Sequence, residues 1–419
     1  MIQVSQEVFV YENLSSDIPL LMGILYIDNI RGNESYAFEY SDEWMAAQKK
    51  QNYIIDPDLP TYRGRQYVPV EKKIFGIFSD TCPDRWGRKL LDRKEIINAS
   101  ADKRKPRKLM ESDYLLGVLD EARMGAIRLS FRENGPFLSD EQDYSVPPWT
   151  TLRQLEEASR EYEKDDNIME DKWLKQLIAP GSSLGGARPK ASVKALDGSL
   201  WIAKFPSKND DIDVSSWEMV VHDLAKMCGL NVLEAMIEKF SKYGSTFLVK
   251  RFDRSGERRI HFASAMTMLG AVDGQSDNYG YLDIAEFLKA NSINVTEDLR
   301  ELWGRIVFSM CVSNTDDHLK NHGFVLARKG WRLSPMYDVN PSLTGDTLSL
   351  MVSENDNRMD LELALKISGL FNIKMSEAEN KLKDIANTVK NNWRPLANKY
   401  GIKRSKLENM APTFANADT

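Results

Sequence analysis

Alternating apolar and polar positions characterise the N-terminal part of the chain. Period-two alternation predicts strands over Val4–Tyr11, Leu20–Asp28 and Tyr36–Tyr40. Gly125–Ser130 has the composition of a further strand, and the turn-rich stretch Pro136–Pro148 marks a boundary. We therefore predict a mixed, β-rich N-terminal domain over residues 1–147.

The pattern changes after that boundary. A glycine-rich stretch, Pro180–Lys190, leads into two short alternating segments, Ala191–Ala195 and Leu200–Phe205. Asp197-Gly198 lies between them, and Asp-Gly between alternating segments is a strong β-hairpin signal. The sequence therefore predicts a second domain over residues 148–257, in which a glycine-rich loop precedes a hairpin.

Two further elements belong to this second domain. Helical spacing covers Val214–Cys228, with Ser215 or Ser216 as the expected N-cap, because a serine oxygen accepts from the first free amides of a helix. Thr246–Phe252 alternates as a strand. Beyond it the chain becomes mostly helical, which predicts a third domain over residues 258–419. Its expected helices are Ser264–Ala271, Tyr281–Ala290, Thr296–Ser309, Leu361–Leu370, Ser376–Asn392 and Trp393–Tyr400.

One predicted hairpin interrupts the helical region. Gly323–Ala327 and Trp331–Leu333 have strand composition and are joined by a short basic turn. We expect Thr413–Thr419 to be disordered, since terminal residues are poorly ordered unless something holds them. The elements together predict an α+β protein with a β-rich N-terminal region and a mostly helical C-terminal lobe.

Charge and cysteine usage exclude several classes of protein. The formal net charge of −6 argues against a protein that coats nucleic acid by bulk charge. Two basic stretches, Ala101–Leu109 and Lys390–Lys406, are expected to be solvated surface, with a nucleic-acid or acidic-partner contact as the alternative. The three scattered cysteines fit a reducing compartment and offer no zinc site. No stretch reaches the roughly 18 apolar residues of a membrane helix, and the N-terminus does not resemble a signal peptide. We expect a cytoplasmic protein with no membrane partner.

Candidate chemistry is concentrated between Cys311 and Val339. An apolar run ends near Asp316, Asn321 follows after four residues, and Asp338 follows the predicted hairpin. This layout suits phosphoryl transfer, in which one Asp accepts a proton while an Asn and a second Asp hold magnesium. The spacing alone leaves an alternative open, since Asp and Asn also form turns and cap helices.

The glycine-rich loop, the hairpin and Lys204 occur in the order found in kinases. Glycine lets backbone amides approach phosphate oxygens, and a lysine on the adjoining strand can neutralise them. The loop is not a Walker A motif. A lysine within the apolar run Trp201–Phe205 is costly unless it is paired or near a ligand. The alternative is an edge-strand lysine that faces water. Glu218 is a candidate partner for Lys204, and Thr246–Phe252 can offer its backbone to adenine.

At these residues the chain resembles the HipA family, the serine/threonine-kinase toxins of bacterial type II toxin–antitoxin modules. The resemblance covers nearly the whole chain, including the N-terminal subdomain of long members. The chain departs from ordinary protein kinases, because Asn314-Thr315 replaces the His-Arg before the catalytic Asp and Tyr337-Asp338-Val339 replaces Asp-Phe-Gly. The motifs that carry the resemblance are Pro83–Arg88, Ser183–Lys190, Trp201–Pro206, Ser313–Asn321 and Ser334–Val339.

The resemblance implies a two-lobed protein-kinase-like fold and a role for each matched residue. Asp316 would be the catalytic base, and Asn321 and Asp338 would hold Mg²⁺. Ser183 would be autophosphorylated as an off-switch, with Ser182 as the alternative, because a phosphate there adds negative charge where the ATP phosphates belong. The residues expected to bind ATP are Ser183, Gly185, Gly186, Ala187, Lys204, Lys250, Phe252, His318, Lys320 and Asp338.

The resemblance also implies cofactors and partners. The cofactors would be ATP and Mg²⁺, and the partner would be a HipB-like helix-turn-helix antitoxin that brings the complex to operator DNA. The substrate would be a protein phosphorylated on serine or threonine, and known family substrates include aminoacyl-tRNA synthetases. Two other functions stay open: a nucleotide-binding co-repressor scaffold with little kinase activity, and a small-molecule kinase. His318 either orients Asp316 or packs within its loop.

Overall fold

The computed structural model describes residues 5–13, 18–30, 32–48, 53–138, 146–164, 177, 186–274 and 278–418. The chain divides into two units. The first contains Met1–Lys208, Lys250–Ala263 and Leu326–Lys329, and the second contains Asn209–Val249, Ser264–Val325 and Gly330–Thr419. The division into three domains stays a prediction. Within the described ranges, no helix has the length and apolar content needed to cross a membrane.

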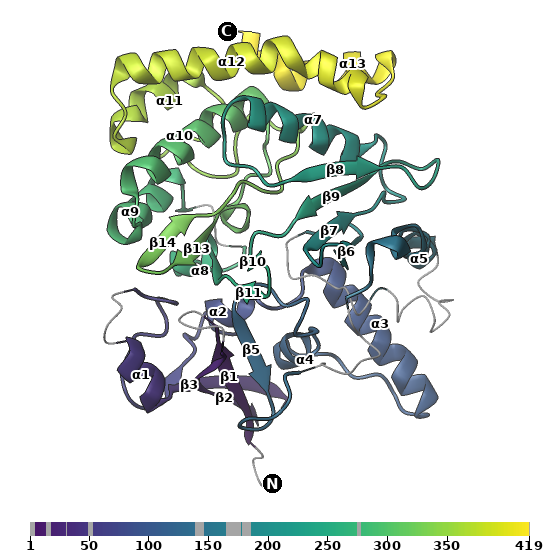
Figure 1. The fold of residues 1–419 in the computed structure, drawn as a ribbon, viewed down its shortest axis with the longest axis vertical. Coiled ribbons are helices and arrows are strands. Elements are labelled where there is room, and N and C mark those ends of the chain that lie inside the picture. The colour runs from purple at the N-terminus through teal and green to yellow at the C-terminus, as the bar shows by residue number, and fades with distance from the viewer. Residues whose placement is uncertain are drawn as a thin grey trace. The chain divides into compact units, whose positions relative to one another are not determined.

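An antiparallel sheet organises the N-terminal part of the first unit (Figure 1). Its strand order is β4-β3-β2-β1-β5. The strands are β1 (Ser5–Glu12), β2 (Leu20–Ile30), β3 (Asn33–Tyr40), β4 (Gln66–Tyr67) and β5 (Ile127–Ser130). Alternate side chains such as Val8, Val10 and Phe38 are fully buried in one core, as the period of two requires. The N-terminal strands predicted from alternation are confirmed.

The first unit also contains several helices. They are α1 (Asp42–Gln48), α2 (Gly76–Ser79), α3 (Arg85–Ala101), α4 (Glu111–Leu116) and α5 (Leu152–Lys164), with the 3₁₀ turn η2 (Trp149–Thr151). The basic stretch after α3 is paired at two points. Arg104 Nη1 lies 2.6 Å from Glu95 Oε1, and Arg107 Nη1 donates to Asp113 Oδ2 at 2.7 Å. These ion pairs favour the expected solvated surface over a nucleic-acid contact.

The predicted hairpin after the glycine-rich stretch is confirmed. It consists of β6 (Lys190–Lys194) and β7 (Leu200–Lys204), and Lys190 lies directly opposite Lys204. The Asp197 carboxylate accepts from Ser199 N at 2.9 Å and so supports the turn. On the other side of β7, Arg251 N donates to Leu200 O at 2.9 Å. The alternative of an edge-strand lysine at Lys204 is therefore wrong, because β7 has a neighbour on both sides. A second small hairpin joins β10 (Arg254–Ser255) and β11 (Arg258–Arg259).

The second unit is mostly helical. Its helices are α7 (Val214–Met227), α8 (Ala265–Met268), α9 (Tyr281–Asn291), α10 (Val295–Cys311), α11 (Leu361–Ile367), α12 (Met375–Lys399) and α13 (Arg404–Met410). Its 3₁₀ segments are η4 (Leu319–Asn321), η5 (Ser368–Phe371) and η6 (Ala411–Asp418). The helix α12 packs against α7 and α10, and it runs unbroken through Pro395 where two helices were predicted (Figure 1).

Short strands complete the fold. They are β8 (Ala235–Glu238), β9 (Thr246–Lys250), β12 (Phe262–Ser264), β13 (Gly323–Ala327) and β14 (Gly330–Leu333). The strands β8 and β9 pair antiparallel. The strands β13 and β14 correspond to the two strands predicted over Gly323–Ala327 and Trp331–Leu333.

Two local predictions are wrong. The N-cap of α7 is Asp213, whose carboxylate accepts from Ser216 N at 3.2 Å, and not Ser215 or Ser216. The C-terminal residues are ordered through Asp418 in η6, because Phe414 is buried and stacks on Trp393 with ring centroids 4.6 Å apart. Contact with the buried face of α12 holds this terminal segment.

Candidate active site

The loop that follows α10 carries the predicted carboxylate and amide. Ser313 has a left-handed backbone (φ 49°) and turns the chain out of the helix. Asp316 is then exposed, whereas Asn321 in η4 is buried. Asn321 Nδ2 donates to the backbone oxygen of Asp316 at 2.8 Å, so the two residues belong to one closed loop. Because the amide nitrogen is engaged, the side-chain oxygen of Asn321 is the atom suited to a cation.

A buried hydrogen-bond network supports this loop on the interior side of Asp317. Asp317, directly after the exposed Asp316, accepts from Tyr281 Oη at 2.5 Å and is paired with His322 Nε2 at 2.8 Å. Burial by itself would raise the pKa of Asp317, but the facing His322 and the hydrogen bonds from His322 and Tyr281 outweigh it and lower that pKa. Adjacent carboxylates thus have opposite environments. Asp316 is exposed at the surface, and Asp317 is fixed in the interior.

Asp338 is held beside this loop through the residues that flank it. Tyr337 Oη donates to the backbone oxygen of Lys320 at 2.8 Å, and Asn340 N donates to Asn314 Oδ1 at 3.2 Å. Asp338 itself has a left-handed backbone (φ 56°), a conformation that aspartate tolerates better than most residues. The structure therefore brings the Asp338 segment to the loop that carries Asp316 and Asn321.

Two other predicted residues lie in the same loop. Lys320 Nζ is paired with Asp273 Oδ2 at 2.7 Å, so its ammonium group has a carboxylate partner. His318 is half-buried, and its Nδ1 is buried with no hydrogen-bond partner among the residues that the structure describes. A buried nitrogen of this kind is satisfied by water or by a bound group. Its position in the Asp316 loop makes His318 a candidate ligand contact, and its role stays a prediction.

Several of the predicted nucleotide-binding residues belong to the first unit. Lys204 is half-buried at the end of β7, and Gly186 and Ala187 are exposed. Ser182, Ser183 and Gly185 lie outside the described residues. Lys250 Nζ lies 6.0 Å from the centre of the Trp201 ring, and Phe252 packs on Phe262 at 5.6 Å between ring centroids. The pairing of Lys204 with Glu218, which is buried in α7, stays a prediction.

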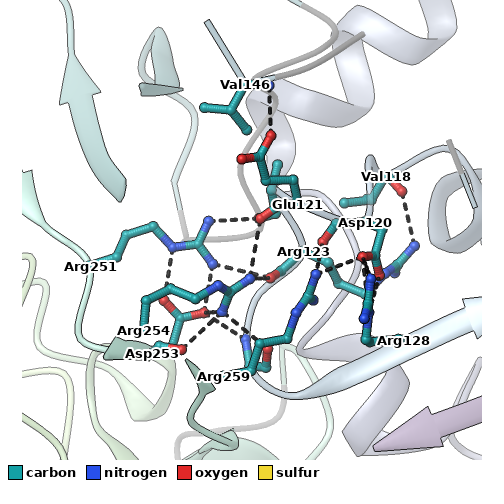
Figure 2. Close-up of polar contacts among 12 residues, drawn as sticks. Val118, Asp120, Glu121, Arg123, Arg128, Val146, Arg251, Asp253, Arg254 and Arg259 are labelled. Carbon is teal, nitrogen blue, oxygen red and sulfur yellow. Dashed lines mark hydrogen bonds and ion pairs between the residues drawn. The ribbon is translucent and has the colours of Figure 1, made fainter. Parts of the chain in front are cut away.

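A buried network of arginines fixes the chain on both sides of Phe252. Figure 2 shows the side chains of Arg251 and Arg254 directed at the carboxylate of Asp253, and each donates to Asp253 Oδ2 at 2.6 Å. Arg251 also donates to Ala122 O at 2.7 Å, and Asp253 Oδ2 accepts from Gly125 N at 2.8 Å. Burial lowers the pKa of Arg254 to about 9, although Asp253 opposes this shift. The segment that follows the predicted adenine strand is therefore anchored to the loop before β5.

Sequence reasoning missed the supporting residues of this site. Tyr281, Asp317 and His322 were not expected to act in it, and neither were the residues of the arginine network. Asp317 and His322 had one available signal, since each is adjacent to a predicted site residue. Tyr281 had none, because it reaches Asp317 from a helix that begins 36 positions earlier.

The side chains present fit a kinase-type magnesium site. No group of three or more His, Cys, Asp or Glu side chains that could hold a metal occurs in the described part of the chain. A kinase does not need such a cage, because one Asn and one Asp bind magnesium together with phosphate oxygens of the nucleotide. The side-chain oxygen of Asn321 and the carboxylate of Asp338 have the required chemistry.

Comparisons with known proteins agree with this fold. Residues 182–393 match the family model described as the HipA-like C-terminal domain. "Putative kinase Y4dM" of Sinorhizobium fredii is 30% identical over 155 residues, which cover 34% of this chain and 37% of the relative. "Putative kinase Y4mE" of the same organism is 28% identical over 192 residues, which cover 40% of this chain and 44% of the relative. The chain therefore spans less than half the length of these two curated relatives.

A solved structure matches over almost the whole chain. It is HipA of the Shewanella oneidensis MR-1 toxin–antitoxin system, in a complex with HipB and its operator DNA. The TM-score is 0.67 at 17% identity, and the match covers 98% of this chain and 95% of that chain. At this identity the likeness establishes the fold. The predicted α+β, kinase-like architecture with a β-rich N-terminal region and a helical C-terminal region is confirmed.

Proposed function

The chain belongs to the family of proteins with a HipA-like C-terminal domain, and from this membership we propose that it is an ATP- and Mg²⁺-dependent protein kinase that acts on serine or threonine. The hydrogen bond from Asn321 to the backbone of Asp316 carries the proposal, because it joins in one loop an exposed carboxylate and an amide whose oxygen has the chemistry to bind magnesium. The names of the curated relatives support the coarser statement that the protein is a kinase.

In this proposal each side chain has a separate task. Asp316 accepts the proton of the attacking hydroxyl, since it is the exposed carboxylate of the pair. Asn321 and Asp338 hold magnesium, which when bound neutralises charge on the nucleotide phosphates. Lys204 binds phosphate from the β7 strand, and the segment Phe247–Phe252, which includes Lys250, provides the strand that contacts adenine. The other members of the nucleotide site are Ser183, Gly185, Gly186, Ala187, His318 and Lys320.

We further propose that this kinase is the toxin of a type II toxin–antitoxin module. A HipB-like helix-turn-helix antitoxin would bind it and bring it to operator DNA, as the composition of the Shewanella complex suggests. Autophosphorylation of Ser183, or of Ser182, would switch the kinase off. Its substrate would be a protein, with aminoacyl-tRNA synthetases as the first class to test.

The test is transfer of labelled γ-phosphate from Mg·ATP by the purified full chain. We expect label on Ser183 or Ser182, its loss in Asp316→Asn, and its retention in the control Asp346→Asn, which changes an exposed carboxylate of the same unit. Ser182→Ala and Ser183→Ala then separate the two serines. Absence of ATP binding would contradict the kinase function. Binding without transfer would favour a co-repressor scaffold, and label on a metabolite alone would favour a small-molecule kinase.

A further inference from the structure

Two segments of the first unit meet in a buried ion pair. Lys190 Nζ lies 3.0 Å from Asp84 Oδ2, and the two side chains are 3% and 2% exposed. Charges this deeply buried persist only when each satisfies the other, and removal of one partner leaves an uncompensated charge. The pair therefore fixes the position of the Lys190 ammonium group much more tightly than a surface pair would.

Asp84 is itself held firmly. Its Oδ1 accepts from Gly87 N at 2.7 Å and so caps the N-terminus of α3. Trp86, in the first turn, packs edge-on against Tyr162 of α5 with ring centroids 5.1 Å apart. The carboxylate is thus a rigid part of the N-terminal half, and it lies outside residues 182–393, the region that matches the family model.

Lys190 occupies a special position in the hairpin. It lies directly opposite Lys204, and opposed residues of an antiparallel pair leave the same face of the sheet. Like charges in this arrangement destabilise the pair unless one is neutralised. Asp84 provides that neutralisation for Lys190.

The ammonium group also lies against the end of the glycine-rich stretch. A Cβ atom built at Gly186 would be 3.2 Å from Lys190 Nζ, and Gly186 has a left-handed backbone (φ 95°). The space of the missing side chain is thus taken by the Lys190 ammonium group. We expect displacement of this group to disturb Gly186, against which it lies, and Lys204, which lies opposite Lys190 in the hairpin. Both residues belong to the proposed nucleotide site.

We propose that Asp84 is a positioning residue for nucleotide binding, which acts through Lys190 to place Gly186 and Lys204. This inference rests on the proposed kinase function. It makes the N-terminal half a working part of the nucleotide site, although that half lies outside the matched domain.

The test compares Asp84→Asn, Lys190→Met and the double variant with wild type in the full chain. We expect each single variant to raise KM for ATP by about ten- to a hundredfold, the order of effect that small misplacements have. The change in kcat should be smaller, because neither residue touches the reacting groups in the proposed function. The double variant should be no worse than the single variants, since both changes disrupt one interaction. Lys190→Arg, which keeps the charge, should recover part of the affinity. Lys194→Met is the control, because it changes an exposed pair with Glu121 on the same strand.

Each outcome decides between the proposals. Lower stability with unchanged KM for ATP would overturn the positioning role. Tighter ATP binding by Asp84→Asn would overturn it as well, because it would mean that Lys190 contacts phosphate itself once Asp84 no longer neutralises it. Loss of ATP binding in Lys204→Met alone would refute this inference. The proposed kinase function would not be affected by that result. A wild type that binds no nucleotide would refute both.

A measurement without variants covers the case in which they do not fold. In wild type, a saturating Mg²⁺-bound ATP analogue should slow amide exchange in peptides that contain Asp84–Arg88 as well as in those that contain Gly186–Lys194. Protection confined to the second segment would refute the coupling.

Discussion

Tyr281 Oη donates to Asp317 Oδ2 at 2.5 Å and thereby ties the start of α9 to the loop that carries Asp316. The position of Tyr281 is itself fixed, because its backbone N donates to Met351 O at 2.9 Å. Gly280 makes this approach possible, since a Cβ there would lie 2.4 Å from the same oxygen. A contact between distant segments therefore sets where Asp317, and with it the neighbouring Asp316, can lie.

Tyr281→Phe tests this support. The change removes one hydrogen bond to a buried carboxylate and leaves the ring, so we expect the free energy of unfolding to fall by about 1.5–3 kcal/mol. Urea denaturation measures it. Tyr243→Phe, at a side chain that is 55% exposed, is the control and should leave the free energy of unfolding unchanged. Equal stability of wild type and Tyr281→Phe would show that the hydrogen bond does not support the loop.

Local pattern predicted much of the fold. Alternation placed the strands around Val8 and Val10, and Asp197-Gly198 predicted the β6–β7 hairpin, because both signals act between neighbouring residues. The spacing of Asp316 and Asn321 likewise corresponds to a hydrogen bond within one loop.

The features that sequence reasoning missed depend on distant partners or on competition between nearby caps. Asp317 is buried only because Tyr281 and His322 face it, and no local period encodes that. Asp213, and not the serines that follow it, is the N-cap of α7, and its carboxylate also accepts from Ser245 N at 3.1 Å. The tail becomes ordered where Phe414 meets Trp393, a residue of another helix.

Asp253→Asn should be among the most destabilising single changes in the first unit. The substitution keeps the shape but leaves Arg251 and Arg254 buried without their counterion (Figure 2). Breaking a buried pair in this way costs about 3–5 kcal/mol. Chemical denaturation measures the loss. Asp356→Asn, which changes a pair with the exposed Arg358, is the control and should have no measurable effect. Similar results for both variants would contradict the importance of the buried network.

Phe414→Ala tests whether the C-terminal segment supports the loop that carries Asp316. Phe414 is 2% exposed and stacks on Trp393, and Thr413 O accepts from Ser313 Oγ at 2.8 Å at the start of that loop. We expect a loss of about 3–5 kcal/mol in the free energy of unfolding, as for other buried aromatics. Faster amide exchange in peptides that contain Ser313 should accompany it.

The control for Phe414→Ala is Phe131→Ala, at a phenylalanine that is 51% exposed. It should change neither the free energy of unfolding nor the amide exchange around Ser313. A stability loss without faster exchange around Ser313 would mean that the segment only covers α12 and does not support the loop.

His261 predicts a pH dependence of stability. Its side chain is buried, and burial lowers the pKa of His261 from 6.5 to about 4. Between these values the unfolded chain binds the proton more tightly than the folded chain, so stability rises with pH. The contribution is complete above 6.5 and is lost as the pH falls toward 4, and it amounts to about 3 kcal/mol.

His261→Asn removes the titrating group and should flatten this part of the profile. Urea denaturation at several pH values between about 4 and 8 measures the slope in both proteins. The hydrogen bond from Leu326 N to the backbone oxygen of residue 261 does not depend on the side chain, so it should survive the substitution. The two proteins are compared first above pH 6.5, where the imidazole is neutral in both the folded and the unfolded chain. Parallel profiles below that pH would show that His261 is not the group whose protonation destabilises the fold in acid.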